Sequence, residues 1–277
     1  MGRSQAKAQP TIDAIKGVNA SVKVKFVEVE LASLESVRAA AQTILDDPEI
    51  TKIDAVINNA AVMACPQIQS ADKLDYQLAI NHLSHFVLTN KIMPKILAAG
   101  PGTRIVNVSS SGHRYCGVRF EDPNFTVLGS YKEFASYGQS KTANILFAVA
   151  LNKRLASRSI RAYAPTPGGV STNLQNYANV LEEERMMALY EDAAWKINGM
   201  SIAESRARDP IKTLQQGCAS LIRPAIDPDI VNEEGIFIDN ANLITDPEVI
   251  KPWATDPELA EKCWTLSEEL VGEKFNI

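Results

Sequence analysis

The sequence lacks the features that mark several common classes of protein. Its four cysteines, Cys65, Cys116, Cys218 and Cys263, are far apart and form no Cys-x-x-Cys unit, which disfavours disulfide scaffolds and zinc sites. No apolar run approaches the ~18 residues of a membrane span, and the polar start MGRSQAKAQP is unlike a signal peptide. Basic residues are not in excess, since the net charge is −5. We therefore expect a soluble cytoplasmic protein without a metal, membrane or nucleic-acid partner.

Apolar, β-branched segments alternate with amphipathic segments along the chain. The 277 residues, of which 45% are hydrophobic, suffice for one well-buried domain spanning residues 1–277. Strands are predicted at 21–31, 53–61, 104–109 and 233–240, and one more begins at 160. Helices are predicted at 3–16, 33–45, 75–97, 179–207, 215–226 and 258–273, and one more begins near 137. Strands that alternate with helices at this spacing predict an α/β fold with a parallel, doubly wound, Rossmann-like sheet.

Tyr137 and Lys141 form the first candidate pair of functional residues. They are four residues apart in SYGQSKTANIL, so a helix places them on one face. An ammonium close to a phenol favours the phenolate and lowers the phenol pKa by about 1 to 3 units. Such a phenol could exchange protons at neutral pH. The spacing alone is a weak signal, because a chain with seven tyrosines often contains it by chance.

A serine-rich turn follows the strand at 104–109. The stretch TRIVNVSSSGH reads as a buried strand that ends in small polar residues. Open α/β sheets place their chemistry at the carboxyl ends of strands, so Ser110 could hold a substrate oxygen near the phenol. Ser109 and Ser111 are the neighbouring alternatives, and Ser110 is preferred as the second serine after Asn107-Val108.

The strand ending Asn-Val-Ser-Ser and the text Tyr-x-x-Ser-Lys-x-x-Asn together resemble the short-chain dehydrogenase/reductase family, in its retinol-dehydrogenase-like branch. The resemblance implies an NAD(P)-dependent ketoreductase-type oxidoreductase. In it Ser110 holds the substrate oxygen, Tyr137 exchanges its proton, and Lys141 tunes the phenol and grips the nicotinamide ribose. Asn81 falls where the family keeps a helix asparagine that relays protons from the lysine through a backbone kink and a bound water.

The resemblance also implies a set of cofactor contacts. Asn58-Asn59-Ala60-Ala61 matches an Asn-Asn-Ala-Gly segment beside the adenosine, with Ala in place of the last Gly. The turn from Pro167 to Thr172 matches the segment that holds the nicotinamide carboxamide. A basic residue at the position of Arg3 favours NADP, because a guanidinium can pair with a 2′-phosphate. The implied cofactor-binding residues are Arg3, Glu30, Leu31, Asn59, Ala60, Tyr137, Lys141, Pro167, Gly168, Val170 and Thr172.

The family's glycine-rich phosphate loop is missing from the sequence. Relatives begin with a strand, a Thr-Gly-x-x-x-Gly-x-Gly loop and a helix, whereas the first glycines here are Gly2 and Gly17. We therefore expect an N-terminally truncated fold with weakened dinucleotide binding and an open sheet edge. Three hypotheses remain: an incomplete sequence of an NADP-dependent reductase, a cofactor-free acid-base isomerase or cyclase, and a non-catalytic binding subunit.

Other sites are weaker candidates. His82 and His85 lack a third metal ligand, so packing roles are preferred. A hydrolase built on Ser110 and His113 lacks a Gly-x-Ser-x-Gly elbow. Residues 173–208 would shape the substrate pocket, where Met186, Met187, Tyr190 and Trp195 suggest an apolar small-molecule ligand, although a packed lid has the same composition. Relatives commonly form dimers or tetramers, so a homo-oligomer is a further expectation.

Overall fold

The protein, seen in a computed structural model that describes residues 1–277 apart from the side chain of Asn179, is built on a five-stranded sheet. The strands are β1 (Ala55–Asn58), β2 (Arg104–Asn107), β3 (Arg161–Pro165), β4 (Phe237–Asp239) and β5 (Asn242–Ile244). They are ordered β1-β2-β3-β4-β5, and β1 to β4 are parallel. β5 was not predicted. It returns antiparallel to β4 through Asn240 and Ala241, which both have positive φ.

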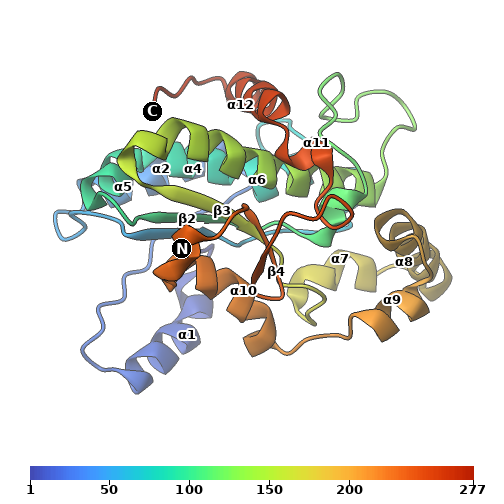
Figure 1. The fold of residues 1–277 in the computed structure, drawn as a ribbon, viewed down its shortest axis with the longest axis horizontal. Coiled ribbons are helices and arrows are strands. Elements are labelled where there is room, and N and C mark those ends of the chain that lie inside the picture. Colours follow the sequence, from blue (N-terminus) through green and yellow to red (C-terminus); the bar gives the residue numbers. More distant parts are fainter.

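Helices cover both faces of this sheet, as Figure 1 shows. The helices are α1 (Gln5–Val18), α2 (Leu34–Asp46), α3 (Tyr76–Leu78), α4 (Ser84–Lys91), α5 (Met93–Ala99), α6 (Glu133–Leu155), α7 (Asn176–Asn179), α8 (Glu183–Asn198), α9 (Ile202–Arg208), α10 (Leu214–Ile226), α11 (Pro252–Thr255) and α12 (Pro257–Val271). α2, α4, α6 and α12 lie on one side, α1 and α10 on the other, and α7 to α9 form a lobe at one end. The predicted doubly wound α/β fold is thus confirmed.

α6 is the central helix of the core. Apolar residues surround it because it lies between the sheet and α12, and its Phe147 packs against Phe86 and Trp264 at ring-centroid distances of 5.2 and 5.9 Å. The Arg154 guanidinium stacks 3.9 Å from the Trp264 ring. Within the described residues, no helix combines the length and apolarity that crossing a bilayer requires.

The strand predicted at 21–31 does not form, which is a correction. Its recorded pairing is a single parallel bridge between Gly2 and Glu28, supported by Gly2 N donating to Val27 O at 3.2 Å and Val29 N to Gly2 O at 2.9 Å. A strand needs a hydrogen-bonded neighbour along its length, and none of the described strands lies beyond β1. The alternating sequence pattern is therefore not sufficient here.

β1 is an edge strand rather than the fully buried strand that was predicted. Val56 and Asn58 face the core, whereas the Ile57 side chain on the opposite face is 41% exposed. The open edge expected from the sequence is present among the described residues.

The helix predicted over 75–97 is divided into several pieces. α3 leads into a π-helical turn at Ala79–Leu83, which continues as α4, and α5 begins at Met93 with Pro94 in its first turn. A π turn inserts an extra residue and bends the helix, and such turns are frequent at functional sites. Asn81 lies within this turn.

Candidate active site

The end of β2 brings Ser110 to the carboxyl edge of the sheet. Val108 N donates to Asn58 O at 3.0 Å and Ser109 N to Pro165 O at 2.7 Å, so the ends of β1, β2 and β3 meet at this edge. After Ser110 the chain turns into a short 3-10 helix, in which the Ser110 hydroxyl accepts from Gly112 N at 3.0 Å. The strand end and this turn together fix the serine.

Gly112 sets the distance between Ser110 and Tyr137, and sequence reasoning missed it. A Cβ on Gly112 would lie 2.8 Å from Tyr137 Cε1 and 3.4 Å from Ser110 Oγ. The phenol ring and the serine hydroxyl therefore both lie close to the small space beside Gly112 Cα. A side chain there would push the ring away from the serine. The signal in the sequence was a glycine two residues after Ser110.

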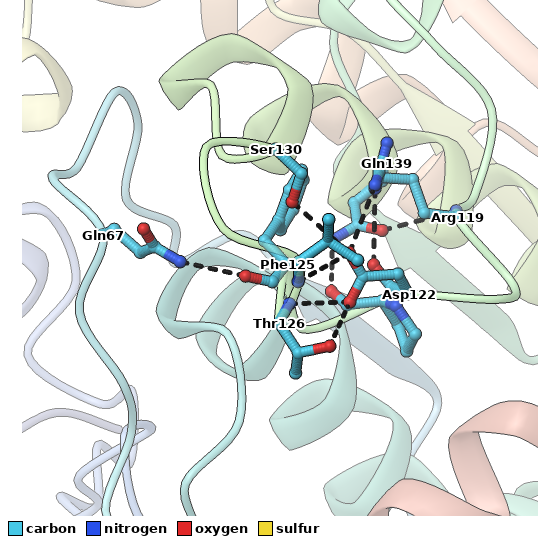
Figure 2. A network of polar contacts seen from close by, with 9 residues as sticks. Gln67, Arg119, Asp122, Phe125, Thr126, Ser130 and Gln139 are labelled. Carbon is cyan, nitrogen blue, oxygen red and sulfur yellow. Dashed lines mark hydrogen bonds and ion pairs between the residues drawn. The ribbon is translucent and has the colours of Figure 1, made fainter.

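The long loop between Ser110 and Tyr137 is fastened to α6 by polar contacts. Asp122 accepts from Thr126 N at 2.7 Å and Thr126 Oγ1 at 2.9 Å, and hydrogen bonds from Thr126 hold the pKa of the Asp122 carboxyl below its usual range. Gln139, two residues after Tyr137, donates to Pro123 O at 2.8 Å. Figure 2 shows Gln139, Arg119 and Asp122 side by side in this network. The loop is thereby tied to the helix that carries the phenol.

Lys141 extends from α6 into the same buried region. Its Nζ donates to Val108 O at 3.0 Å and lies 5.6 Å from the centroid of the Tyr137 ring. The ammonium has three donors, of which this bond uses one. Burial lowers the Lys141 pKa to about 7, since few groups nearby replace the water that would stabilise the charge.

The pKa of the Tyr137 phenol differs from the sequence-based expectation, which the structure corrects. Burial raises the pKa of Tyr137 to about 12, and a hydrogen bond with Ser110 opposes that rise without cancelling it. Lys141 does not lower this pKa here, because its ammonium points to Val108 O and is itself destabilised by burial. Tyr137 is therefore a protonated phenol at neutral pH in this structure.

Ser109 is excluded as an alternative to Ser110. It is buried, and its hydroxyl donates to Lys141 O at 2.8 Å, which links β2 to α6. Ser110 is partly exposed and lies against the phenol. The structure thus favours the serine chosen from the sequence.

Asn81 connects the π turn to its surroundings. Its side chain accepts from Val62 N at 2.8 Å and donates to Val62 O and Ser140 Oγ, each at 2.9 Å. Its own carbonyl contacts His85 Nδ1 at 3.2 Å. The asparagine therefore joins the segment after β1 to α6 within the turn that kinks the helix.

The histidines have packing roles. His82 lies between Asn144 Oδ1 (3.2 Å) and Ser267 Oγ (2.8 Å), and burial lowers its pKa to about 4. Burial and then the nearby Lys141 charge lower the His85 pKa to about 4. His113 Nδ1 contacts Ser110 O at 2.7 Å rather than the hydroxyl. No metal-ligand cluster occurs among the residues that the structure describes.

The predicted nicotinamide turn follows β3 at the same sheet edge. Gly168 has φ of +75°, and a Cβ there would lie 2.1 Å from Lys212 Nζ. Lys212 also donates its backbone N–H to Gly169 O at 2.7 Å and forms an ion pair with Asp209 at 3.3 Å. Lys212 was not singled out in the sequence, because its contact with the turn is made across 44 residues of chain.

Comparisons with known proteins identify the family of the chain. A family model described as short chain dehydrogenase matches residues 1–121, which ends before Tyr137. Retinol dehydrogenase 14 of Mus musculus is 34% identical over 256 residues, covering 92% of this chain and 69% of that protein. Short-chain dehydrogenase/reductase prx1 of Penicillium roqueforti is 30% identical, covering 90% and 71%. The chain belongs to the short-chain dehydrogenase family.

A solved structure from Mycobacterium paratuberculosis, described only as an uncharacterized protein, shares the fold of this short-chain dehydrogenase. It superposes with a TM-score of 0.65 at 28% identity, covering 100% of this chain and 85% of that one. The family assignment makes the chain an oxidoreductase of the class that uses nicotinamide dinucleotides and acts on small molecules.

The residues predicted to contact the adenosine are more exposed in this short-chain dehydrogenase than Tyr137 and Lys141 are. Asn59 and Ala60 follow β1 and are exposed at the sheet edge. Arg3 Nη1 pairs with Glu30 Oε2 at 3.7 Å on the surface, so these two predicted cofactor residues do lie together. Glu30 Oε1 accepts from Ala32 N at 3.0 Å, and the Leu31 carbonyl accepts from Ser84 Oγ.

A lid formed by α8 covers the phenol. Met186, Leu189 and Tyr190 pack in one apolar cluster with Tyr137, whose side chain is only 4% exposed. Met187 and Trp195, also predicted to line a pocket, are instead exposed on the outer face of α8, which is a correction. The helical period explains this, because 186, 189 and 190 share a face that 187 does not.

The lid is held closed by three polar groups. Tyr115 Oη donates to Asp192 Oδ2 at 2.8 Å, while Lys196 Nζ donates to Tyr115 Oη at 2.9 Å and pairs with Asp192 at 3.2 Å. Tyr115 belongs to the loop that follows Ser110, so α8 is joined directly to the serine side of the site.

Proposed function

We propose that this protein is an NADP-dependent oxidoreductase that transfers a hydride between the nicotinamide and a carbonyl or secondary alcohol of an apolar small molecule. The observation that supports this most directly is the convergence of Ser110, Tyr137 and Lys141 in one buried site at the carboxyl edge of the sheet. The chemistry of this family transfers a hydride and a proton. It needs a proton donor next to the substrate oxygen and a cation close to that donor.

The protonated Tyr137 phenol has the form that carbonyl reduction requires. A bound nicotinamide would supply the hydride to the carbonyl carbon. Ser110 Oγ holds the carbonyl oxygen, and Tyr137 Oη donates its proton to that oxygen as negative charge develops. A phenol that is protonated at neutral pH is ready to act as this acid. In the reverse direction it must first lose its proton, which burial opposes.

Lys141 and Asn81 would restore the proton. With a pKa of about 7, Lys141 changes protonation state near neutral pH, so it can pass a proton toward the phenol side of the site. Asn81 lies in the π turn next to α6, where its carbonyl contacts His85 Nδ1 and its side chain donates to Ser140 Oγ. We assign Asn81 to this relay.

The residues present fit the nicotinamide half of a dinucleotide. Lys141 retains two donors that no described acceptor uses, which suits ribose hydroxyls. Asn59 and Ala60, together with the turn that includes Pro167, Gly168, Val170 and Thr172, are the remaining contacts we assign. Arg3, mostly exposed beside Glu30, is the group we assign to a 2′-phosphate.

The pyrophosphate half has a poorer fit. Among the described residues no glycine-rich loop opens a helix at the end of a strand, and the 21–31 segment is not part of the sheet. Each missing charge-assisted hydrogen bond weakens binding by about 1.5 to 3 kcal/mol. We expect NADPH to bind this chain more weakly than a dinucleotide with a full phosphate cradle would be bound.

The apolar side chains on the inner face of α8 favour an apolar substrate. Met186, Leu189 and Tyr190 would line the space above the phenol once α8 moves outward. Because the relatives include proteins named retinol dehydrogenase, retinaldehyde is the first carbonyl to test, with hexanal and cyclohexanone as smaller probes.

The proposal is tested by titrating the 277-residue chain with NADPH and NADH, followed by turnover with these carbonyls. We expect NADPH to bind in the micromolar to millimolar range and to be oxidised only when a carbonyl is present. Failure to bind at several millimolar NADPH would contradict hydride transfer by this chain.

The poor pyrophosphate fit favours one second candidate, a cofactor-free acid-base reaction such as an isomerisation or cyclisation at Tyr137. It predicts turnover without any dinucleotide and loss of that turnover in Tyr137→Phe. If turnover is absent both with and without a dinucleotide, the protein would be a binding subunit.

A further inference from the structure

A cleft lies at the amino edge of the sheet, opposite the edge that carries Ser110. Its cavity has a volume of about 750 Å³. Arg104 and Arg161 are the first residues of β2 and β3 and form a register pair on adjacent parallel strands. The end of α10 and the turn after it form the other wall of this arginine cleft.

The two arginines are register partners, and neither guanidinium pairs with a carboxylate among the described residues. Arg104 is only 6% exposed, and its recorded hydrogen bonds run from Nη1 to the carbonyls of Gly102 and Thr103. The Nε atoms of both arginines are buried without an acceptor among the described residues. Like charges on neighbouring strands repel, and a buried cation without an anion is costly.

Asp227, the acidic residue of the cleft, is already committed to other partners. Its Oδ2 pairs with Arg223 Nε at 3.0 Å, and its Oδ1 accepts from Asp229 N at 3.0 Å. Arg223 also pairs with Glu233, so one arginine serves two carboxylates and this corner carries one excess negative charge. No carboxylate pairs with Arg104 or Arg161 within 4.0 Å in the described part of the chain, and the charge of Arg104 acts on Asp227 only at longer range.

Tyr163 lies beside Arg161 behind the cleft. Its hydroxyl is buried, and the Arg161 guanidinium lies 6.0 Å from the Tyr163 ring centroid. The two residues are i and i+2 on β3 and so lie on the same face of the sheet. Arginine forks match the geometry of carboxylate and phosphate oxygens.

The rest of the cleft is apolar. Ala225 and Ile226 end α10, Val231 lies on the following turn, and Ile226 is 73% exposed although it faces the cleft. We propose that the arginine cleft binds an organic oxyanion, in which a carboxylate or phosphate engages Arg104 and Arg161 and a short apolar group packs on Ile226 and Val231. The site is separate from the active site and does not depend on the proposed function.

The test uses the complete 277-residue chain and four probes: sodium hexanoate, butyl phosphate, inorganic phosphate and hexan-1-ol. Binding is measured by isothermal titration calorimetry at fixed ionic strength. We expect hexanoate or butyl phosphate to bind saturably below about 10 mM and hexan-1-ol, which lacks the charge, not to bind. The two anions distinguish a carboxylate from a phosphate ligand, and inorganic phosphate shows whether the apolar part contributes.

Two variants and a matched control locate the site. Arg161→Gln should weaken binding of the tighter probe roughly tenfold or more, because charge-assisted hydrogen bonds are lost. Ile226→Glu places a carboxylate at an exposed position of the cleft and should also weaken it. Arg158→Gln removes the same charge from an exposed position outside the cleft and should leave binding unchanged. Circular dichroism checks that each variant is folded.

The proposal is overturned if no anionic probe saturates below about 10 mM, or if Arg161→Gln binds as the unaltered chain does. It is also overturned if Arg158→Gln weakens binding as much as Arg161→Gln, since the effect would then be one of general surface charge.

Discussion

Two regions of this short-chain dehydrogenase differ in how far they are buried and hydrogen-bonded: the carboxyl edge of β1 to β3 and the first 33 residues. At the sheet edge, Asn58, Asn81 and Lys141 are almost fully buried, and hydrogen bonds join β1, β2 and α6. By contrast, α1 buries none of its residues, and the single bridge of the segment after it joins Glu28 to Gly2 rather than to the sheet. The candidate catalytic residues are positioned by many mutually dependent contacts, whereas the N-terminal residues predicted to contact the adenosine are positioned by few.

This difference has a consequence for function. Chemistry requires side chains held within a fraction of an ångström, which a buried network supplies. Cofactor phosphates require backbone N–H groups on a rigid turn, which the first 33 residues do not offer in this arrangement. Substitutions at the edge should therefore change activity strongly, and substitutions near the N-terminus should change it weakly.

The largest expected effect is that of Tyr137→Phe. Removing the proton donor should lower kcat for carbonyl reduction by about 10² to 10⁴ while leaving the fold intact. Tyr131→Phe is the control, because its hydroxyl donates to Cys65 O at 2.7 Å outside the catalytic group. Tyr131→Phe should lower the free energy of unfolding by about 1 kcal/mol and change activity little. Equal activity loss in the two variants would remove the special role of Tyr137.

The second prediction concerns the pH dependence of stability through Lys141. Its folded pKa of about 7 lies below the ordinary 10.5, so between these values the unfolded chain holds a proton that the folded chain does not. Stability from this group therefore rises with pH. Relative to Lys141→Met, which cannot titrate, the unaltered chain should gain roughly 2 to 3 kcal/mol between pH 7 and 9 in urea unfolding. A difference that stays constant with pH would show that Lys141 is not desolvated.

Glycine substitutions compare the two regions directly. Gly112→Ala places a Cβ 2.8 Å from the Tyr137 ring and should destabilise the protein by about 1 to 3 kcal/mol and reduce turnover. Gly17→Ala, in α1 with no atom within 4 Å of the added Cβ, should stabilise it by up to about 1 kcal/mol. Thermal unfolding of both variants measures this, and similar effects at the two sites would invalidate the comparison.

The smallest effect is expected at Arg3. Its ion pair with Glu30 is exposed, so Arg3→Gln should change stability by less than about 0.5 kcal/mol. If Arg3 meets the 2′-phosphate, the same variant should weaken NADPH several-fold and leave NADH unchanged in a parallel titration. Equal weakening of both cofactors would rule out that assignment.

The sequence predicted the residues whose placement is local and missed those whose placement is not. Tyr137 and Lys141 share a helix face, and Ser110 ends a strand, so spacing alone was sufficient for them. The 21–31 strand was wrong because pairing depends on a distant neighbour. The Tyr137 pKa was wrong in direction because burial by α8 and α6 cannot be read from a four-residue spacing.

The most direct test follows a label from the cofactor to the product. The protein is incubated with a carbonyl substrate and NADPH that carries deuterium at the transferable position of the nicotinamide, and the alcohol is analysed by mass spectrometry. The account predicts one deuterium on the former carbonyl carbon, formed by the unaltered chain and at least about a hundredfold more slowly by Tyr137→Phe. Product without deuterium, or equal labelling rates in both proteins, would contradict it.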